Sequence, residues 1–280
     1  MRVCDLHTHS HFSDGSWSPK QLIAEAKRIG LTALALTDHN TVAGLPALLK
    51  AAEGTTVTAI SGCEFSVDYR GKELHLLALF IPPKHFQTIA DHLQEVNDRK
   101  VQSNRDLCAA LTAAGYPVDY DALCRRFPKS RINRAHIAEV LTENGHTKSV
   151  KYAFDTLLHT DAGYYVPPPR PTVEETIAFV RELGAAPVLA HPFLQLDEPQ
   201  LREFLPSAKQ AGLLGLEVYY TKYDEATTRC ACELAAEFEL LPSGGSDFHG
   251  DAKPDTKLGV GTGQLAVPTV WAEVIGRAVR

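Results

Sequence analysis

Short apolar runs alternate with amphipathic segments along most of this chain, and this alternation constrains the fold more than any other feature. Most runs are followed by a segment whose apolar residues recur at helical spacing, such as the one that starts at Ser18 and Pro19 and ends at Gly30. The runs comprise residues 3–6, 34–37, 57–61, 74–81, 187–190, 215–218 and 240–243. Strands that alternate with helices build parallel sheets, so about seven units of this kind predict an α/β barrel.

The middle of the sequence differs from the rest in its charge and in the spacing of its apolar residues. From about residue 85 to 131 it is richer in charge and helical in spacing, and helices are also expected at 134–144 and 148–158. The proline-rich stretch at 166–171 fits neither a helix interior nor a central strand. We therefore expect a barrel built from residues 1–99 and 169–280, interrupted by a helical, substrate-capping lobe at 100–168.

Side chains that can bind metals gather where the apolar runs end. The nine candidates are His7, His9, Asp14, His39, Glu64, His75, His191, Asp247 and His249. The carboxyl ends of barrel strands meet on one face, so residues far apart in the sequence converge there. In a strand, residues two apart point the same way, so His7 and His9 can bind one ion.

This mixture of ligands also predicts the kind of metal and the chemistry. Imidazole and carboxylate together suit manganese, iron or zinc. Nine ligands exceed what one ion takes, so we expect two or three divalent ions, with Mn²⁺ favoured over Fe²⁺ and Zn²⁺. Such a centre suits phosphate esters, because the ions lower the pKa of a bridging water and neutralise phosphoryl oxygens.

Five short motifs surround these candidates and occur in a fixed order. They are D-L-H-T-H-S at 5–10 with S-D-G at 13–15, T-D-H-N at 37–40, G-C-E-F at 62–65, A-H-P at 190–192 and S-D-F-H at 246–249. Together they resemble the PHP family of metal-dependent phosphoesterases. The resemblance implies a distorted (β/α)7 barrel of the TIM type, with an inserted helical lobe and a trinuclear metal centre.

The resemblance also implies a role for each candidate. The first ion would be held by His7, His9, Glu64 and Asp247, the second by Glu64, His75 and His191, and the third by Asp14, His39 and His249. Asp247 would in addition orient the attacking water or accept its proton. His191 or His249 would assist the leaving alkoxide.

A further motif, S-R-I-N-R-A-H-I-A at 130–138, resembles the TrpH/YciV-like branch of the family. Members of that branch act on nucleoside 3′,5′-bisphosphates and on the 5′ ends of short RNA. Arg134 and His136 are then expected to contact the substrate phosphate, with Arg131 and Asn133 as further candidates. The chemistry agrees, since a guanidinium fork matches a phosphate dianion and helix N-termini favour anions.

Composition limits the partners. The net charge of −6 and pI near 6.1 argue against a protein that coats duplex nucleic acid, which requires a basic surface. No run approaches the ~20 apolar residues of a membrane helix, and the N-terminus lacks the pattern of a signal peptide. We expect a cytoplasmic enzyme that acts on a small phosphorylated substrate, a nucleotide or short RNA.

Three other functions fit parts of the pattern. A histidinol-phosphate-type phosphatase would use the same centre. A metal-dependent amidohydrolase that cleaves a C–N bond also uses H-x-H on a barrel, but it would need a carbamylated lysine, and no lysine ends a predicted strand. A non-catalytic PHP module would be expected to lack ligands.

Two neighbouring features complete the expectations. Asp5 and Asp38 lie next to candidate ligands, where a carboxylate commonly accepts an imidazole N–H. Gly244 and Gly245 are expected to allow a tight exit from the last strand.

Overall fold

The computed structural model describes residues 2–128 and 132–279. The chain divides into two compact units: Met1–Ala90 together with Arg170–Arg280, and Asp91–Pro169. The first unit contains all the strands of the described residues, and the second is helical.

The first unit is built around one eight-stranded sheet with the order β7-β6-β5-β4-β3-β2-β1-β8. The strands are β1 Val3–Asp5, β2 Ala33–Leu36, β3 Thr58–Tyr69, β4 Lys72–Leu79, β5 Ala186–Leu189, β6 Gly215–Tyr220, β7 Leu241–Gly245 and β8 Val267–Pro268. The sheet curls until β1 and β7 meet, where the Leu6 N–H donates to the Gly244 carbonyl at 3.1 Å. The expected α/β barrel is therefore confirmed.

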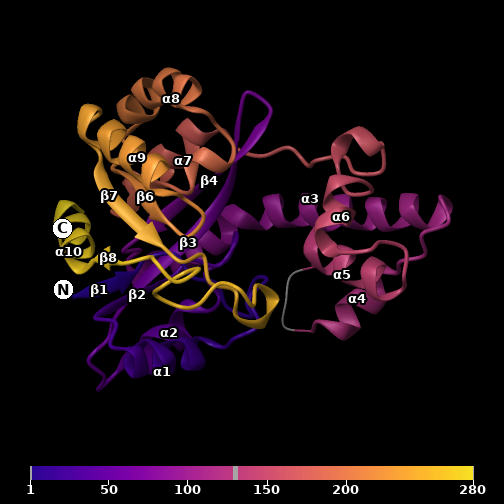
Figure 1. Cartoon of the computed structure of the whole chain (residues 1–280), viewed down its shortest axis with the longest axis horizontal. Helices are drawn as coiled ribbons and strands as arrows, with labels where there is room; N and C mark the ends of the chain where they lie inside the picture. Colours follow the sequence, from indigo (N-terminus) through magenta and orange to yellow (C-terminus); the bar gives the residue numbers. More distant parts are fainter. Residues whose placement is uncertain (1, 129–131, 280) are drawn as a thin grey trace. The chain divides into compact units, whose positions relative to one another are not determined.

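Helices cover the outside of this barrel (Figure 1). They are α1 Pro19–Ile29, α2 Leu45–Ala52, α7 Val173–Glu182, α8 Glu198–Ala211, α9 Glu225–Glu237 and α10 Thr269–Ala278. Helix α1 begins and ends as the sequence predicts, with a capping box at Ser18 and Gly30 in the left-handed conformation at its end. Helix α10 and strand β8 were not anticipated.

The barrel interior is apolar toward the amino ends of the parallel strands. Inward-facing residues of β1, β2, β4 and β5 form one cluster with Ala272 and Ile275 of α10. Helix α10 therefore packs against the apolar end of the barrel interior, where the parallel strands begin. Polar side chains are left to the opposite end, where the parallel strands finish.

Strand β4 departs from the expected parallel arrangement. It pairs antiparallel with both β3 and β5, because β3 runs on to Tyr69 and turns back through Arg70 and Gly71. Both turn residues have positive φ, 51° and 80°, as a tight hairpin turn requires. We expected β3 to end at residue 61 and to be followed by another parallel strand, and this expectation was wrong.

The reversal explains the position of His75. In an antiparallel strand the first residues lie at the level where the parallel strands end, and His75 pairs with Ser66. Its side chain shares a face with Leu77 and Leu79, which lie in the barrel interior.

Gly244 and Gly245 are the last two residues of β7, where the sequence predicts a tight strand exit. The structure adds a second reason for the absence of side chains here. A Cβ on Gly244 would meet Tyr219 at 2.5 Å, and a Cβ on Gly245 would meet His7 at 2.4 Å. The pair thus allows β7 to approach β6 and β1 closely where the barrel closes.

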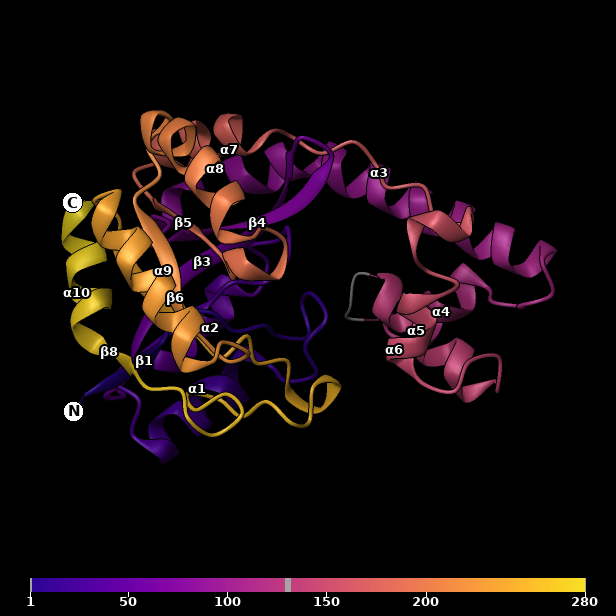
Figure 2. The ribbon, with the colours of Figure 1, turned by 45° about the horizontal axis from the view of Figure 1, so that its top comes forward.

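The second unit has its own core. Its helices are the long α3 Phe86–Ala113, which begins in the first unit, and α4 Tyr120–Arg126, α5 Arg134–Glu143 and α6 Val150–Asp155 (Figure 2). Leu107 and Leu111 of α3 pack with Leu123, Ile137 and Leu141. The role of this part as a substrate-capping lobe stays a prediction.

Candidate metal centre

The H-x-H motif follows β1 and points both imidazoles inward. Thr8, between them, faces β2, where its hydroxyl donates to the Ala35 carbonyl at 2.6 Å. His7 and His9 are fully buried, and their Nε2 atoms lie 3.1 Å apart. The alternation of side chains along an extended segment therefore produces the pair that the sequence predicts.

Glu64 lies at the middle of the cluster, where both of its oxygens face imidazoles. Oε2 lies 3.3 Å from Nε2 of His7, 3.2 Å from Nε2 of His9 and 2.9 Å from Nδ1 of His39. Oε1 lies 2.7 Å from Nδ1 of His75 and 3.1 Å from Nε2 of His191. Five histidines from four separate segments of the chain thus surround one buried carboxylate.

A second acid, Asp14, gathers the remaining candidates. Its Oδ1 lies 3.3 Å from Nε2 of His249 and its Oδ2 lies 3.7 Å from Nε2 of His39. The Nδ1 of His249 lies 2.8 Å from the Asp247 carbonyl, to which it can donate, so its Nε2 is left to face the cluster. His9 completes this group.

The arrangement of these atoms fits metal binding. Three groups of potential ligand atoms each lie within 4.8 Å of one another: His9, Asp14, His39 and His249; His7, His9 and Glu64; His39, Glu64 and His75. Atoms about 2.1 Å from one ion lie roughly 3 Å from each other, which matches the distances around Glu64. Within the described residues, Glu64 Oε2, His9 Nδ1 and His191 Nδ1 are buried with no hydrogen-bond partner.

The charges of the cluster are strongly coupled. Burial alone would raise the pKa of Glu64, but His39, His75 and His7 hold it well below its usual range. Burial would lower the pKa of His75, yet the Glu64 carboxylate raises it to about 10. Without ions, the Glu64 carboxylate is therefore ionised and pairs with a positively charged His75, and a bound cation would supply the positive charge instead.

Two backbone conformations at the site are unusual. His191 has φ 27° and Asp247 has φ 53°, both in the left-handed region that costs a non-glycine residue free energy. Strain of this kind persists where surrounding contacts fix it, often at functional sites. Both residues follow the end of a parallel strand, β5 or β7.

Asp5 and Asp38 have a role other than the expected one. Asp5 accepts from the N–H and hydroxyl of Ser246, at 2.9 and 2.6 Å. Asp38 accepts from the N–H and hydroxyl of Ser10, at 2.7 and 2.6 Å, and from the Ser13 hydroxyl. They therefore fix the loops that carry the candidate ligands, and the prediction that they accept imidazole N–H groups was wrong.

Sequence reasoning missed three residues next to the cluster. Glu217 of β6 is fully buried and its Oε1 lies 3.1 Å from His7 Nδ1. Tyr220 and Lys253 both donate to Asp247 Oδ2 at 3.0 Å. An acid within the apolar run of residues 215–218 was the available signal for Glu217; Lys253 carries no comparable signal.

The described candidate phosphate contacts, Asn133, Arg134 and His136, belong to the helical unit. Asn133 caps α5, accepting from Ala135 and His136, and its own N–H donates to His136 Nδ1 at 3.2 Å. The guanidinium of Arg134 lies over the Tyr165 ring, 4.2 Å from its centroid. Arg131 lies outside the described residues.

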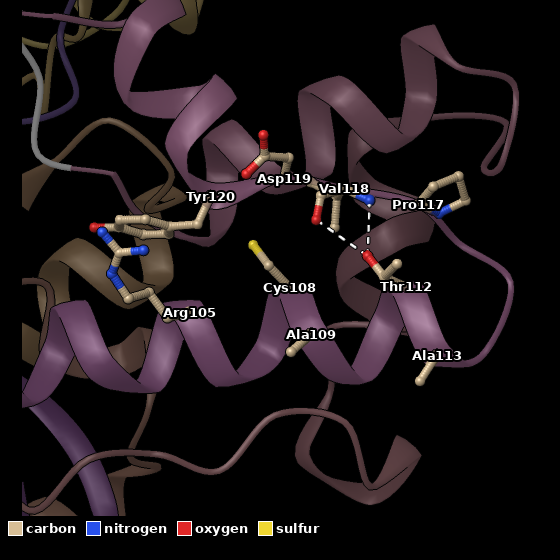
Figure 3. Close-up of a pocket in the computed structure, with 9 residues that line it drawn as sticks. All are labelled: Arg105, Cys108, Ala109, Thr112, Ala113, Pro117, Val118, Asp119 and Tyr120. Carbon is tan, nitrogen blue, oxygen red and sulfur yellow. Dashed lines mark hydrogen bonds between the residues drawn. The ribbon is translucent and has the colours of Figure 1, made fainter.

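The helical unit also carries an open groove of about 760 Å³ beside α3 (Figure 3). Arg105 lies over the Tyr120 ring at its edge, 4.4 Å from the centroid, and Thr112 exchanges hydrogen bonds with the backbone of Val118. The described phosphate candidates Asn133, Arg134 and His136 are not among its lining residues. The groove is therefore distinct from the predicted phosphate contacts.

No helix of the described residues has the length and apolar character that crossing a bilayer requires.

Fold and site together define a metal-dependent hydrolase, a barrel whose strand ends converge on imidazoles and carboxylates suited to several cations. The sequence profile of the PHP domain matches residues 5–157, more than half of the 280 residues. The chain therefore belongs to the PHP family and is a metal-dependent phosphoesterase.

Several known proteins resemble the chain along most of its length. A 5′-3′ exoribonuclease Rnm from Salmonella typhimurium is 28% identical, over 88% of this chain and 85% of that protein. A 3′,5′-nucleoside bisphosphate phosphatase from Chromobacterium violaceum is 27% identical, over 100% and 99%. A phosphoribosyl 1,2-cyclic phosphate 1,2-diphosphodiesterase from Eggerthella lenta is 32% identical, over 88% and 94%.

The fold has a close counterpart of known structure. A protein from Bifidobacterium adolescentis, described as a metal-dependent phosphoesterase, matches with a TM-score of 0.85 and 28% identity. The match covers 99% of this chain and 96% of that one. The likeness therefore extends to the residues after 157, which include His191, Asp247 and His249.

Proposed function

We propose that this chain removes the 3′-phosphate from a nucleoside 3′,5′-bisphosphate and also trims short RNA from its 5′ end. The observation that carries the proposal is the Glu64 carboxylate, with imidazole nitrogens of five histidines within 3.3 Å of its oxygens. The relatives named as a bisphosphate phosphatase and an exoribonuclease support this substrate class.

Two or three divalent ions would complete the site, with manganese as the expected metal. The first would be held by His7, His9, Glu64 and Asp247, the second by Glu64, His75 and His191, and the third by Asp14, His39 and His249. Such ions, when bound, lower the pKa of the attacking water and neutralise the negative charge of the phosphoryl oxygens.

The side chains of the protein have separate tasks in this scheme. Asp247 orients the attacking water or accepts its proton. His191 or His249 donates a proton to the leaving alkoxide. Because the cluster is buried around Glu64, competing water is kept from these groups, which strengthens their electrostatic effect.

The helical unit supplies phosphate recognition in this proposal. Arg134 and His136 contact the substrate phosphate, assisted by Asn133 and Arg131. Arg134 and Asn133 stand at the first turn of α5, where backbone N–H groups favour anions. Its substrate is thus a small nucleotide or short RNA; a cytoplasmic location remains our expectation from the sequence.

The test is phosphate release by the purified protein and by Glu64→Ala and Asp247→Asn. Chelation should abolish release and added Mn²⁺ should restore it, while both variants should stay inactive with Mn²⁺ present. Retention of wild-type turnover by either variant would contradict the assignment. Equal turnover of histidinol phosphate and the bisphosphate would remove the preference for nucleotides.

Three alternatives are separated by the same assay. The Eggerthella lenta relative makes a cyclic phosphodiester a necessary comparison substrate. An amidohydrolase would cleave a C–N bond, but in this proposal Glu64, whose two oxygens face His7 and His75, would take the bridging role that a carbamylated lysine has there. A non-catalytic module would bind metal and hydrolyse no phosphate ester.

A further inference from the structure

Glu217 is a buried acid outside the nine candidate ligands, and it contacts two of them. It lies on β6 with none of its surface exposed. Its Oε1 and Oε2 lie 3.1 and 3.4 Å from His7 Nδ1, and Oε2 accepts the backbone N–H of His191 at 2.7 Å. A buried carboxylate requires compensation of this kind.

The contact with His7 decides which of its ring nitrogens offers a lone pair. A carboxylate only accepts hydrogen bonds, so His7 Nδ1 carries the proton that is donated to Glu217. The neutral ring then presents an unprotonated Nε2. That atom lies 3.3 Å from Glu64 Oε2 and 3.1 Å from His9 Nε2, in the middle of the cluster.

The contact with His191 acts on the backbone. His191 has φ 27° and ψ 54°, and its N–H is fixed in direction by Glu217 Oε2. In this conformation the His191 Nε2 lies 3.1 Å from Glu64 Oε1. One carboxylate on β6 therefore orients candidate ligands that follow β1 and β5.

We infer that Glu217 is a positioning residue, which sets the tautomer of His7 and the backbone orientation of His191 so that both Nε2 atoms can bind a divalent cation. This inference rests on the metal centre of the proposed function. It assigns Glu217 no contact with the substrate or the reacting atoms.

Glu217→Gln tests the inference with almost no change in size. The His191 N–H can only donate, so the amide oxygen must face it, and the amide NH₂ then faces His7 Nδ1. That arrangement favours the opposite tautomer, with the proton on Nε2, where it blocks a cation. We expect about 10- to 100-fold weaker binding of Mn²⁺ and Zn²⁺, the usual effect of losing such a partner.

Two measurements test the expected loss of ion affinity and the expected change in the His7 tautomer. Competition titration gives the ion affinities, and ¹⁵N NMR of the zinc-loaded protein shows which His7 nitrogen carries a proton. In the wild type His7 should have a protonated Nδ1 and a coordinated Nε2. The matched control is Asp5→Asn, another fully buried acid, whose partners are Ser246, the Gly259 N–H and the His7 backbone N–H. It should lower stability and leave the His7 tautomer unchanged.

Each outcome has a definite meaning. Unchanged ion affinity in folded Glu217→Gln overturns the inference, and so does a zinc-loaded wild type in which His7 Nδ1 lacks a proton, even if the variant fails to fold. A wild type that binds ions but hydrolyses no phosphate ester contradicts the proposed function and leaves the inference standing. A wild type that binds no divalent ion overturns both.

Discussion

The two oxygens of Asp247 face different surroundings. Oδ2 accepts from the Tyr220 hydroxyl and from Lys253 Nζ, both at 3.0 Å. Oδ1 lies 3.3 Å from His9 Nε2 and faces the cluster. Burial would raise the pKa of Asp247, but Lys253 and His249 hold it well below its usual range. The carboxylate is therefore ionised, with Oδ1 as the oxygen available to an ion or a water.

Tyr220→Phe should test this arrangement. Burial, together with Asp247 and Glu217, raises the pKa of the Tyr220 phenol, so it remains a hydrogen-bond donor. Loss of that donor should weaken Mn²⁺ binding about tenfold and reduce phosphate release in parallel. Tyr223→Phe is the matched control, because the Tyr223 hydroxyl accepts from the Phe193 N–H, whereas the Tyr220 hydroxyl donates to the Asp247 carboxylate. Equal effects of the two variants would contradict the role given to Tyr220.

Among individual residues, sequence reasoning identified those that belong to short motifs at strand ends. The nine predicted candidates come together in the structure because strand ends of a barrel converge. Glu217 was missed, since an isolated acid in an apolar run has no motif around it. Asp5 and Asp38 were given the wrong partners, because adjacency in the sequence does not reveal that a serine lies closer than an imidazole.

Among the elements, the hairpin of β3 and β4 departs most from a regular barrel. It places His75 at the same level as the ends of the parallel strands, within 2.7 Å of Glu64. The signal in the sequence was the pair Arg70 and Gly71 between two apolar stretches. We missed it because alternation of strands and helices elsewhere favoured a parallel unit.

Gly71→Ala should destabilise the barrel unit through this turn. Gly71 has φ 80° and no atom within 4 Å of an added Cβ, so the cost is conformational and not steric. We expect a loss of about 1–2 kcal/mol in the free energy of unfolding, measured with urea. Gly71→Asn should lose less, because asparagine tolerates the left-handed region better than alanine. An alanine variant as stable as the wild type would contradict the turn geometry.

On the scale of the whole molecule, the chain combines a barrel that carries the metal-binding candidates with a helical unit that has a separate core. The sequence predicted both parts from periodicity. Strand β8 escaped prediction, because a two-residue strand carries too little periodicity to recognise.

The proposed division of work between the two parts predicts the effect of Arg134→Ala. It should raise KM for the bisphosphate while leaving Mn²⁺ affinity unchanged, since Arg134 belongs to the helical unit. Arg134→Lys should raise KM less than Arg134→Ala does, but still above the wild-type value, because an ammonium group lacks the planar fork that matches phosphate. Steady-state kinetics with parallel metal titration would decide, and a fall in metal affinity would argue against the division.

The cluster brings together residues that lie far apart in the sequence, as the contact between His7 and Glu217 across 210 residues shows. During synthesis on the ribosome, the first histidines emerge long before the acids and imidazoles that will face them. Contacts of such sequence separation form late and slowly. The ribosome must therefore have passed Asp247 and His249 before the whole cluster can assemble, and a shorter nascent chain lacks part of the surroundings that a cation would need.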